Sequence, residues 1–81
     1  MDYNEGKILE VEGINVCILD VENVNGLDYI YAAEIVEDDI TGNFYVYKVE
    51  NQKVVKVTDS NELKKTLPLF IETMSKKSEE F

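Results

Sequence analysis

The chain lacks histidine, arginine and tryptophan and has one cysteine among its 81 residues. Without histidine it has no side chain that ordinarily exchanges a proton near neutral pH. The lone Cys17 excludes an internal disulfide and a thiolate cluster for zinc. Catalysis would have to rest on Cys17, a lysine, a tyrosine or a carboxylate pair, and none of these stands in a recognisable catalytic arrangement. We therefore predict that the protein is not an enzyme and has no catalytic residues, no cofactor and no metal site.

Long apolar runs are also missing. No stretch approaches the roughly 20 residues that a bilayer-spanning helix needs. The first seven residues are acidic and polar, where a secretory signal would be basic and then apolar. Cys17 lies between Val16 and Ile18, which predicts a small buried hydrophobe and not a reactive thiol. With one cysteine and no targeting segment, we expect a cytoplasmic protein.

Positive charge is scarce. Seventeen Asp and Glu residues face eight Lys residues, and the net charge is −9. Phosphate backbones and anionic lipids repel such a chain, so we expect no direct nucleic-acid binding and no membrane binding. Basic protein surfaces, in contrast, attract it. The alternative interpretation is that the charge only keeps the protein soluble.

The most informative feature that is present is a change of period. Apolar residues from Ile8 to Val57 form short β-type stretches, and after Asp59 they recur at helical spacing. Asn25-Gly26 is typical of a two-residue type I′ hairpin, and we expect a longer loop at 37–43 with Gly42 at its tightest point. The length predicts a single domain, 1–81, with frayed termini at 1–6 and 76–81. The predicted strands are 7–11, 14–22, 27–36, 44–49 and 53–57.

The hairpin turns predict which residues face one another. A turn at 25–26 pairs strands 14–22 and 27–36, and a turn around 50–52 pairs the last two strands. Both faces of the resulting sheet are partly apolar, which indicates a curled or barrel-like sheet or a face covered by something outside this chain. The predicted pairs are Val21 with Ile30, Leu19 with Ala32, Ile18 with Ala33, Val16 with Ile35, Val49 with Val54, Val46 with Val57 and Tyr47 with Lys56.

The last segment predicts a helix. Asp59 can cap its first turn, and Glu62 can reach back toward the cap. Pro68 lacks an amide hydrogen and clashes with the preceding turn, so we expect a kink or two short helices. The fold class is therefore α+β: a small antiparallel meander of four or five strands with a kinked C-terminal helix packed on one face. The apolar stripe of this helix consists of Leu63, Leu67, Phe70 and Met74, widened by Ile71.

The acidic stretch at 37–43 is not a calcium loop of the EF-hand type. A loop that begins at Glu37 places Gly42 correctly at the sixth position. Its twelfth position is Lys48, where the motif requires a glutamate. We therefore interpret the stretch as a solvated loop.

The strand-rich part of the chain resembles the YrzB-like small acidic bacterial domains of unknown function. The resemblance covers about residues 14–74 and departs at Pro68 and in the absence of a strong acidic stretch near the start. It implies a compact α+β domain and brings no catalytic residues. The segments that carry it are Val16-Cys-Ile-Leu-Asp20, Asn25-Gly-Leu-Asp-Tyr29, Tyr45-Val-Tyr-Lys48 and Val55-Lys-Val-Thr-Asp59, followed by an amphipathic helix.

These features favour a non-catalytic acidic interaction module that docks on a basic protein surface. An alternative is a nucleic-acid-mimicking inhibitor of the phage type, which occupies the DNA or RNA site of a basic protein. It would be favoured if Asp20 and Glu22 clustered on one face with Glu34, Glu37, Asp38 and Asp39 at a spacing near that of DNA phosphates. A catalytic or ligand-binding domain is the third hypothesis. A second copy of the chain is a further candidate partner, because a core of this size is small. The candidate interaction surface consists of Glu34, Glu37, Asp38, Asp39, Tyr45 and Tyr47.

Overall fold

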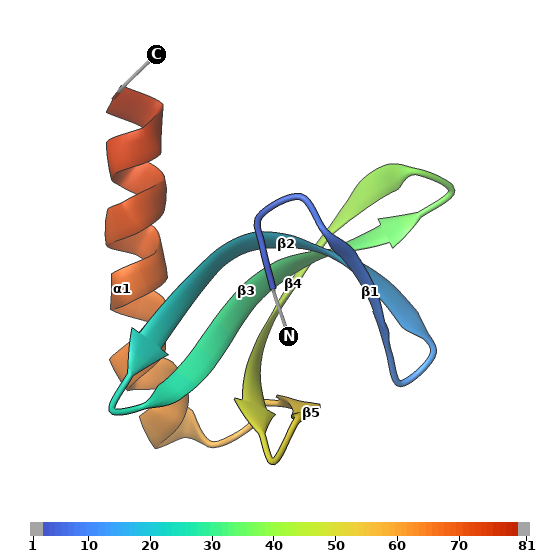
Figure 1. The fold of residues 1–81 in the computed structure, drawn as a ribbon. Helices are drawn as coiled ribbons and strands as arrows, with labels where there is room; N and C mark the ends of the chain where they lie inside the picture. The colour runs from blue at the N-terminus through green and yellow to red at the C-terminus, as the bar shows by residue number, and fades with distance from the viewer. Residues whose placement is uncertain (1–2, 80–81) are drawn as a thin grey trace.

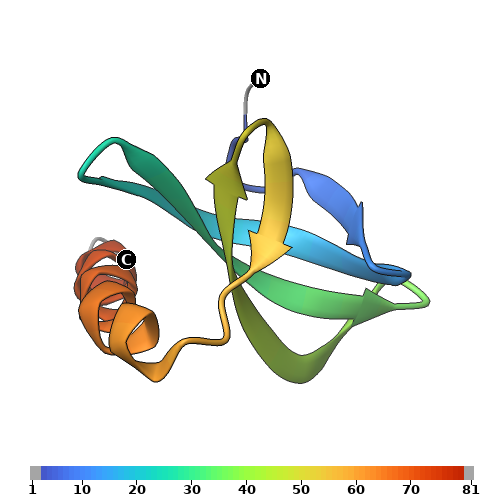
Figure 2. The same ribbon diagram turned by 90° about the horizontal axis from the view of Figure 1, so that it is seen from below.

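The protein folds as a curled half-barrel sheet with one helix against its outer side (Figures 1 and 2). The computed structural model describes the backbone of residues 3–79 and the side chains of residues 3–76. The five strands are antiparallel and lie in chain order. This architecture confirms the predicted α+β class. The elements are β1 (Ile8–Val11), β2 (Ile14–Val24), β3 (Leu27–Val36), β4 (Asp39–Glu50), β5 (Lys53–Lys56) and α1 (Ser60–Glu79).

Each pair of neighbouring strands is joined by a two-residue turn. Both residues of every turn have positive φ, as the type I′ hairpin requires. Asn25-Gly26 is the predicted turn, and its φ angles are 53° and 86°. The predicted loop at 37–43 is wrong, because Glu37 and Asp38 alone make the turn and Gly42 lies within β4. Positive φ is uncommon outside glycine, and Glu lacks the tolerance for it that Asn and Asp have, so Glu37-Asp38 does not announce a tight turn.

The register between β2 and β3 contains a β-bulge. Val21 faces Ile30 as predicted, but the pairing shifts by one residue between Ile18 and Asp20. Leu19 is the extra residue of the bulged strand. The predicted pairs of Leu19 with Ala32, Ile18 with Ala33 and Val16 with Ile35 are therefore wrong. Ile18 instead faces Ala32, Cys17 faces Ala33 and Val16 faces Glu34.

The predicted register between β4 and β5 is confirmed. Val49 faces Val54 and Tyr47 faces Lys56. The amide of Val57 donates a hydrogen bond to the Val46 carbonyl, with the nitrogen 2.8 Å from the oxygen. This last bond continues the pairing beyond the end of β5.

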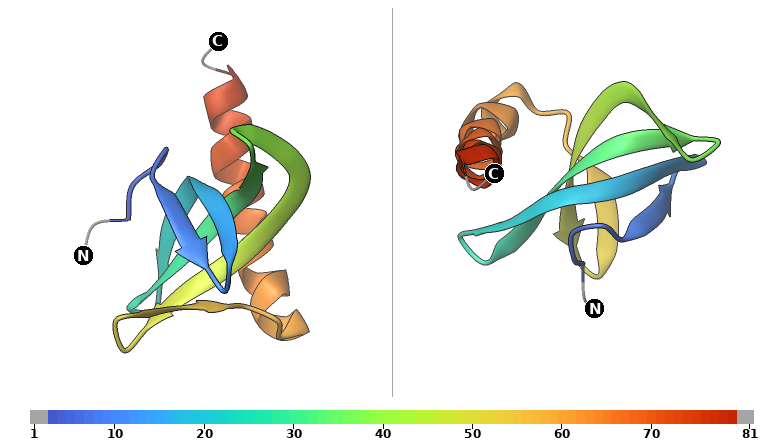
Figure 3. Two further views of the ribbon diagram at one scale, coloured as in Figure 1. Left: turned by 90° about the vertical axis from the view of Figure 1, so that its right-hand side faces the viewer. Right: turned by 90° about the horizontal axis from the view of Figure 1, so that it is seen from above.

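Two apolar cores lie on opposite faces of the sheet. The inner core fills the concave side, because β1 and β5 curl away from α1 (Figure 3). The outer core lies between the sheet and α1. Buried members of the inner core are Val11, Val16, Ile18, Ile30, Ala32 and Tyr47, and those of the outer core are Tyr29, Val46, Val57 and Phe70.

Helix α1 is one uninterrupted element. The Asp59 cap is confirmed, because Oδ1 of Asp59 accepts a hydrogen bond from the Asn61 amide at 2.9 Å. The expected division at Pro68 is wrong, since α1 continues through this residue, and the kink is not confirmed. The stripe packs as predicted at Leu63, Leu67 and Phe70.

The expected fraying of the termini falls partly outside the described residues, which exclude 1–2 and 80–81. At the start, the amide of Gly6 donates to the Ile18 carbonyl at 2.8 Å, which ties the segment before β1 to β2. At the other end, the backbone of residues 76–79 is helical. Within residues 3–79, no helix is both long enough and apolar enough to cross a membrane.

Candidate functional site

An apolar row crosses four strands on the outer face of the sheet, beside α1. Directly paired residues of antiparallel strands share a face, so their register aligns them in rows across the strands. Ile8 pairs with Cys17, Cys17 pairs with Ala33, and Ala33 pairs with Phe44. We call these four residues the apolar row. Its two ends are open, because Ile8 is 60% exposed and Phe44 is 48% exposed.

Aromatic stacking connects the apolar row to the outer core. The rings of Phe44 and Tyr31 are stacked with centroids 5.8 Å apart. Tyr31 stacks in turn on Phe70 of α1, with centroids 5.4 Å apart. Both spacings lie in the range of favourable ring pairs. The three rings therefore form one ladder from the exposed row to the buried side of the helix.

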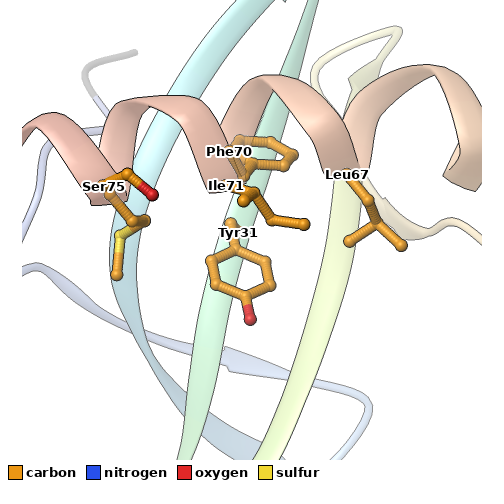
Figure 4. A pocket seen from close by; sticks show the side chains of 6 residues that line it. Tyr31, Leu67, Phe70, Ile71 and Ser75 are labelled. Atoms are coloured by element: carbon orange, nitrogen blue, oxygen red, sulfur yellow. The ribbon is translucent and has the colours of Figure 1, made fainter.

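A shallow groove runs between α1 and the sheet beside this ladder. Figure 4 shows α1 crossing the strands, with Tyr31 and Ile71 beside the open space. The groove has a volume of about 300 Å³. Ile71, which was expected to widen the buried stripe, is 63% exposed and stands at the edge of the groove. The lining residues are Tyr31, Leu67, Phe70, Ile71, Met74 and Ser75.

A network of hydrogen bonds fixes the start of α1 on the sheet. The hydroxyl of Tyr29 donates to Oε2 of Glu62 at 2.9 Å, and Nζ of Lys48 donates to Oε1 of Glu62 at 3.1 Å. Burial raises the pKa of Tyr29, and its bond to Glu62 raises it further. The bonds that Lys48 makes to Glu62 and Glu50 raise the pKa of Lys48. Glu62 thus contacts the sheet, and its expected reach back toward the cap is wrong.

Three of the candidate residues lie together at the tip of the β3–β4 hairpin. Glu37 and Asp38 are the turn, and Asp39 is the first residue of β4. All three are exposed. We call these three residues the acidic turn. Two exposed apolar side chains, Val36 and Ile40, lie beside it.

Glu34 belongs to a bulge and not to an open acidic surface. Its Oε1 accepts hydrogen bonds from Oγ1 of Thr41 at 2.8 Å and from Nδ2 of Asn43 at 2.9 Å. These bonds, that from Asn43 first, hold the pKa of Glu34 below its usual range. The irregular pairing between Ala33 and Ile35 lies at this point, and Gly42 has a φ of 94°. The carboxylate therefore closes the bulge that Gly42 permits.

The two tyrosines of the candidate surface lie on the inner face. Tyr47 is 2% exposed and belongs to the inner core, so it cannot contact a partner directly. Burial raises the pKa of Tyr47. Tyr45 is half-buried, and Nζ of Lys56 lies 4.7 Å from its ring centroid. The six candidates therefore do not form one surface.

Two further acids, Asp20 and Glu22, lie on β2. Asp20 is 5% exposed. Oε1 of Glu22 accepts a hydrogen bond from the Thr73 hydroxyl of α1 at 2.6 Å. Neither carboxylate joins the acidic turn. The single acidic face that would imitate a row of phosphates is therefore absent from the described residues.

The apolar row was missed from the sequence for a definite reason. The bulge at Leu19 brings Cys17, and not Ile18, opposite Ala33. The irregular pairing at Glu34 determines that Phe44 lies opposite Ala33. The one available signal was the apolar character of both faces, which indicated a face covered by something outside the chain. Cys17, expected to be a small buried hydrophobe, is half-buried in this row.

No group of three potential metal ligands is found in the part of the chain that the structure describes. The chain matches no protein-family model, no curated protein and no solved structure. The resemblance to YrzB-like domains therefore stays a prediction.

Proposed function

We propose that the protein is a non-catalytic interaction module that binds a partner protein at the apolar row and the adjoining groove. The observation that carries the proposal is the exposed end of the aromatic ladder. Phe44 is 48% exposed, yet its ring is stacked on that of Tyr31. Ordered aromatic side chains at an exposed position are typical anchors of protein interfaces, because little conformational entropy is lost when a partner covers them.

The extent of the apolar surface supports the same conclusion. Single exposed apolar residues are normal on a protein surface, but contiguous ones mark interaction sites. Here Ile8 and Phe44 are exposed at the two ends of the row, Cys17 next to Ile8 is half-buried, and Ala33 is fully buried between Cys17 and Phe44. The row adjoins a groove edged by exposed Ile71. A partner that covers this strip removes apolar area from water at about 25 cal/mol per Å².

The charge of the chain supports a basic partner. The net charge of −9 attracts a positive surface over about one Debye length, roughly 8 Å at 0.15 M salt. The acidic turn lies on the strands that supply Ala33 and Phe44 to the apolar row. We therefore expect association to slow as salt rises, while dissociation changes little, because the apolar contacts are not screened.

The test compares two exposed apolar residues of the outer face. Phe44→Ser removes the anchor of the proposed site, and Val55→Ser removes a residue of similar exposure on β5, opposite Lys48. Wild type, Phe44→Ser and Val55→Ser are immobilised at equal density, and proteins captured from cells of the source organism are compared by quantitative mass spectrometry. A captured protein is then purified and its affinity measured against all three.

The proposal expects a partner whose binding is weakened at least tenfold by Phe44→Ser and unchanged by Val55→Ser. Equal binding of that partner to all three proteins would contradict the proposed site. Circular dichroism and urea denaturation of each variant confirm that a lost interaction is not lost folding.

A further inference from the structure

We infer that the partner segment is an amphipathic α-helix, which lies beside α1 on the apolar row and carries lysine or arginine on the side facing the acidic turn. This inference rests on the proposed function, because it names the occupant of the same surface.

The chemistry of the row requires an occupant that satisfies its own backbone. Ile8, Ala33 and Phe44 offer no hydrogen-bonding side-chain atoms, and the thiol of Cys17 is only a weak donor. At the middle of the row β2 and β3 are paired on both sides; a strand could add only to the outer edge of β1 or of β4 at Phe44, where it would run along that edge and not across the row. An extended segment laid on the row would bury backbone amides and carbonyls without partners, which is costly. A helix bonds these groups internally and presents only side chains.

The geometry of the outer face has room for such a helix. Since α1 crosses the strands (Figure 4), the apolar row runs alongside it. The row spans three steps between strands of about 4.8 Å each, or roughly 14 Å, which is between two and three helical turns. Packed helices lie 8–10 Å apart, so Ile71 at the edge of the groove would contact the added helix. The apolar residues of the occupant would recur at i, i+3, i+4 and i+7.

The acids define the orientation of the charged side. Glu37 follows the last residue of β3 and is four residues after Ala33, a separation of at most about 13 Å. A helix with its side chains is about 10–12 Å across, so a lysine on its far side can reach the acidic turn. Glu10, paired with Asn15, lies next to the Ile8–Cys17 pair on the same face at the other end of the row. Basic residues on the side of the added helix that faces away from α1 therefore meet carboxylates at both ends of the apolar row.

A second copy of this chain fits the surface less well. Its one helix already packs Leu63, Leu67 and Phe70 on its own sheet, so it has no complete apolar face to offer. Each copy also carries a net charge of −9, which opposes association. Self-association is nevertheless included as an outcome of the test.

The experiment uses Cys17 as a reporter, because it is the only thiol of the chain and lies within the row. The probe is a designed 18-residue peptide (a chosen length of about five helical turns) with leucine at the helical spacing and lysine on one flank. A first control peptide replaces lysine with glutamate. A second has the composition of the probe but alternates leucine and lysine, as an extended strand would. The rate of Cys17 alkylation by iodoacetamide is measured by mass spectrometry with increasing peptide.

The inference expects the helical lysine peptide to slow alkylation. At a free concentration ten times Kd the rate should fall about tenfold by mass action. Phe44→Ser should abolish this protection and Val55→Ser should retain it, which separates site binding from general attraction to an acidic protein. Glu37→Gln with Asp38→Asn should weaken protection more than Glu50→Gln with Asp28→Asn, a pair that removes the same charge at the opposite ends of β3 and β4. Nuclear magnetic resonance shifts at Phe44 and Ile71 locate the bound peptide.

The outcomes distinguish this inference from the proposed function. Stronger protection of Cys17 by the alternating peptide would overturn the helical occupant. The same conclusion would follow if no peptide protected Cys17 while partner capture still depended on Phe44. Either result would leave the proposed interaction module standing. Protection that grows with protein concentration in the absence of peptide, together with a dimer in sedimentation equilibrium, would replace the helix by a second copy. Capture that is independent of Phe44 would overturn both.

Discussion

Replacement of Phe70 by alanine tests whether α1 depends on a single aromatic contact. Phe70 is 1% exposed and stacks on Tyr31 with centroids 5.4 Å apart. Removal of a buried phenylalanine costs about 3–5 kcal/mol, including the cavity that remains. Loss of the ring pair alone accounts for about 0.5–1.5 kcal/mol beyond the buried area. We expect Phe70→Ala to lower the free energy of unfolding by about 4–5 kcal/mol, because Tyr31 also stacks on Phe44.

This loss is large relative to the whole domain. At 0.05–0.15 kcal/mol per residue, a chain of 81 residues is stable by roughly 4–12 kcal/mol. An isolated helix of 20 residues with an internal proline is marginal in water. Phe70→Ala should therefore release α1 before the sheet unfolds. The inner core does not include Phe70 and remains packed.

The assay is urea denaturation followed by two signals. Circular dichroism at 222 nm reports the helix, and tyrosine fluorescence also reports the inner core through Tyr47. In the wild type the two transitions should coincide, and in Phe70→Ala the helix signal should be lost first. Ile71→Ala is the matched control, because Ile71 is the next residue of α1 and is 63% exposed. If Phe70→Ala cost no more than Ile71→Ala, the outer core would not hold the helix.

Three further predictions concern backbone and charge. Pro68→Ala should raise the free energy of unfolding by about 1–3 kcal/mol, since Pro68 is exposed and the alanine amide can bond the Lys64 carbonyl; a loss in chemical denaturation would show that the ring packs. The lowered pKa of Glu34 means that its ionised form stabilises the fold above the unfolded pKa of about 4.3. The stability difference between wild type and Glu34→Gln should therefore be constant from pH 5 to 7 and shrink as pH falls below about 4; a difference that grew on acidification would contradict this assignment. The raised pKa of Tyr29 stabilises the fold below the unfolded pKa of about 10, so stability should fall above that pH, less steeply in Tyr29→Phe; equal slopes in alkaline denaturation would exclude this contribution.

The sequence predicted the fold wherever the signal was local. The Asn25-Gly26 turn, the cap at Asp59 and the pairing of Val49 with Val54 all depend on residues close together in the chain. The alternation of apolar residues and the types of turn residue are sufficient for such features. The division of the helix at Pro68 failed because packing against the sheet compensates one missing hydrogen bond.

The site could not be predicted in the same way. A bulge adds one residue without disturbing the β character of its neighbours, so Leu19 looked like an ordinary strand residue. One residue of slip moves side chains to the other face of a sheet. Two bulges therefore had to be known before Cys17 and Phe44 could be placed in one row. The acids of the candidate surface were predicted from composition. Composition gives the net charge of the chain but not the positions of its acidic side chains in the fold.

The meander order of the strands has a consequence for the folding kinetics. Each strand pairs only with its neighbours in the chain, so the sheet forms without closing a long loop. The hydrogen bonds between distant parts of the chain include those of α1, namely the bond from Tyr29 to Glu62 and that from Thr73 to Glu22, which is 51 residues away in the chain. The hairpins can thus assemble progressively as the chain leaves the ribosome, and the helix docks last. Until it docks, Tyr29 and Tyr31 face water, and this nascent intermediate is the species most prone to aggregation or to early capture by a partner.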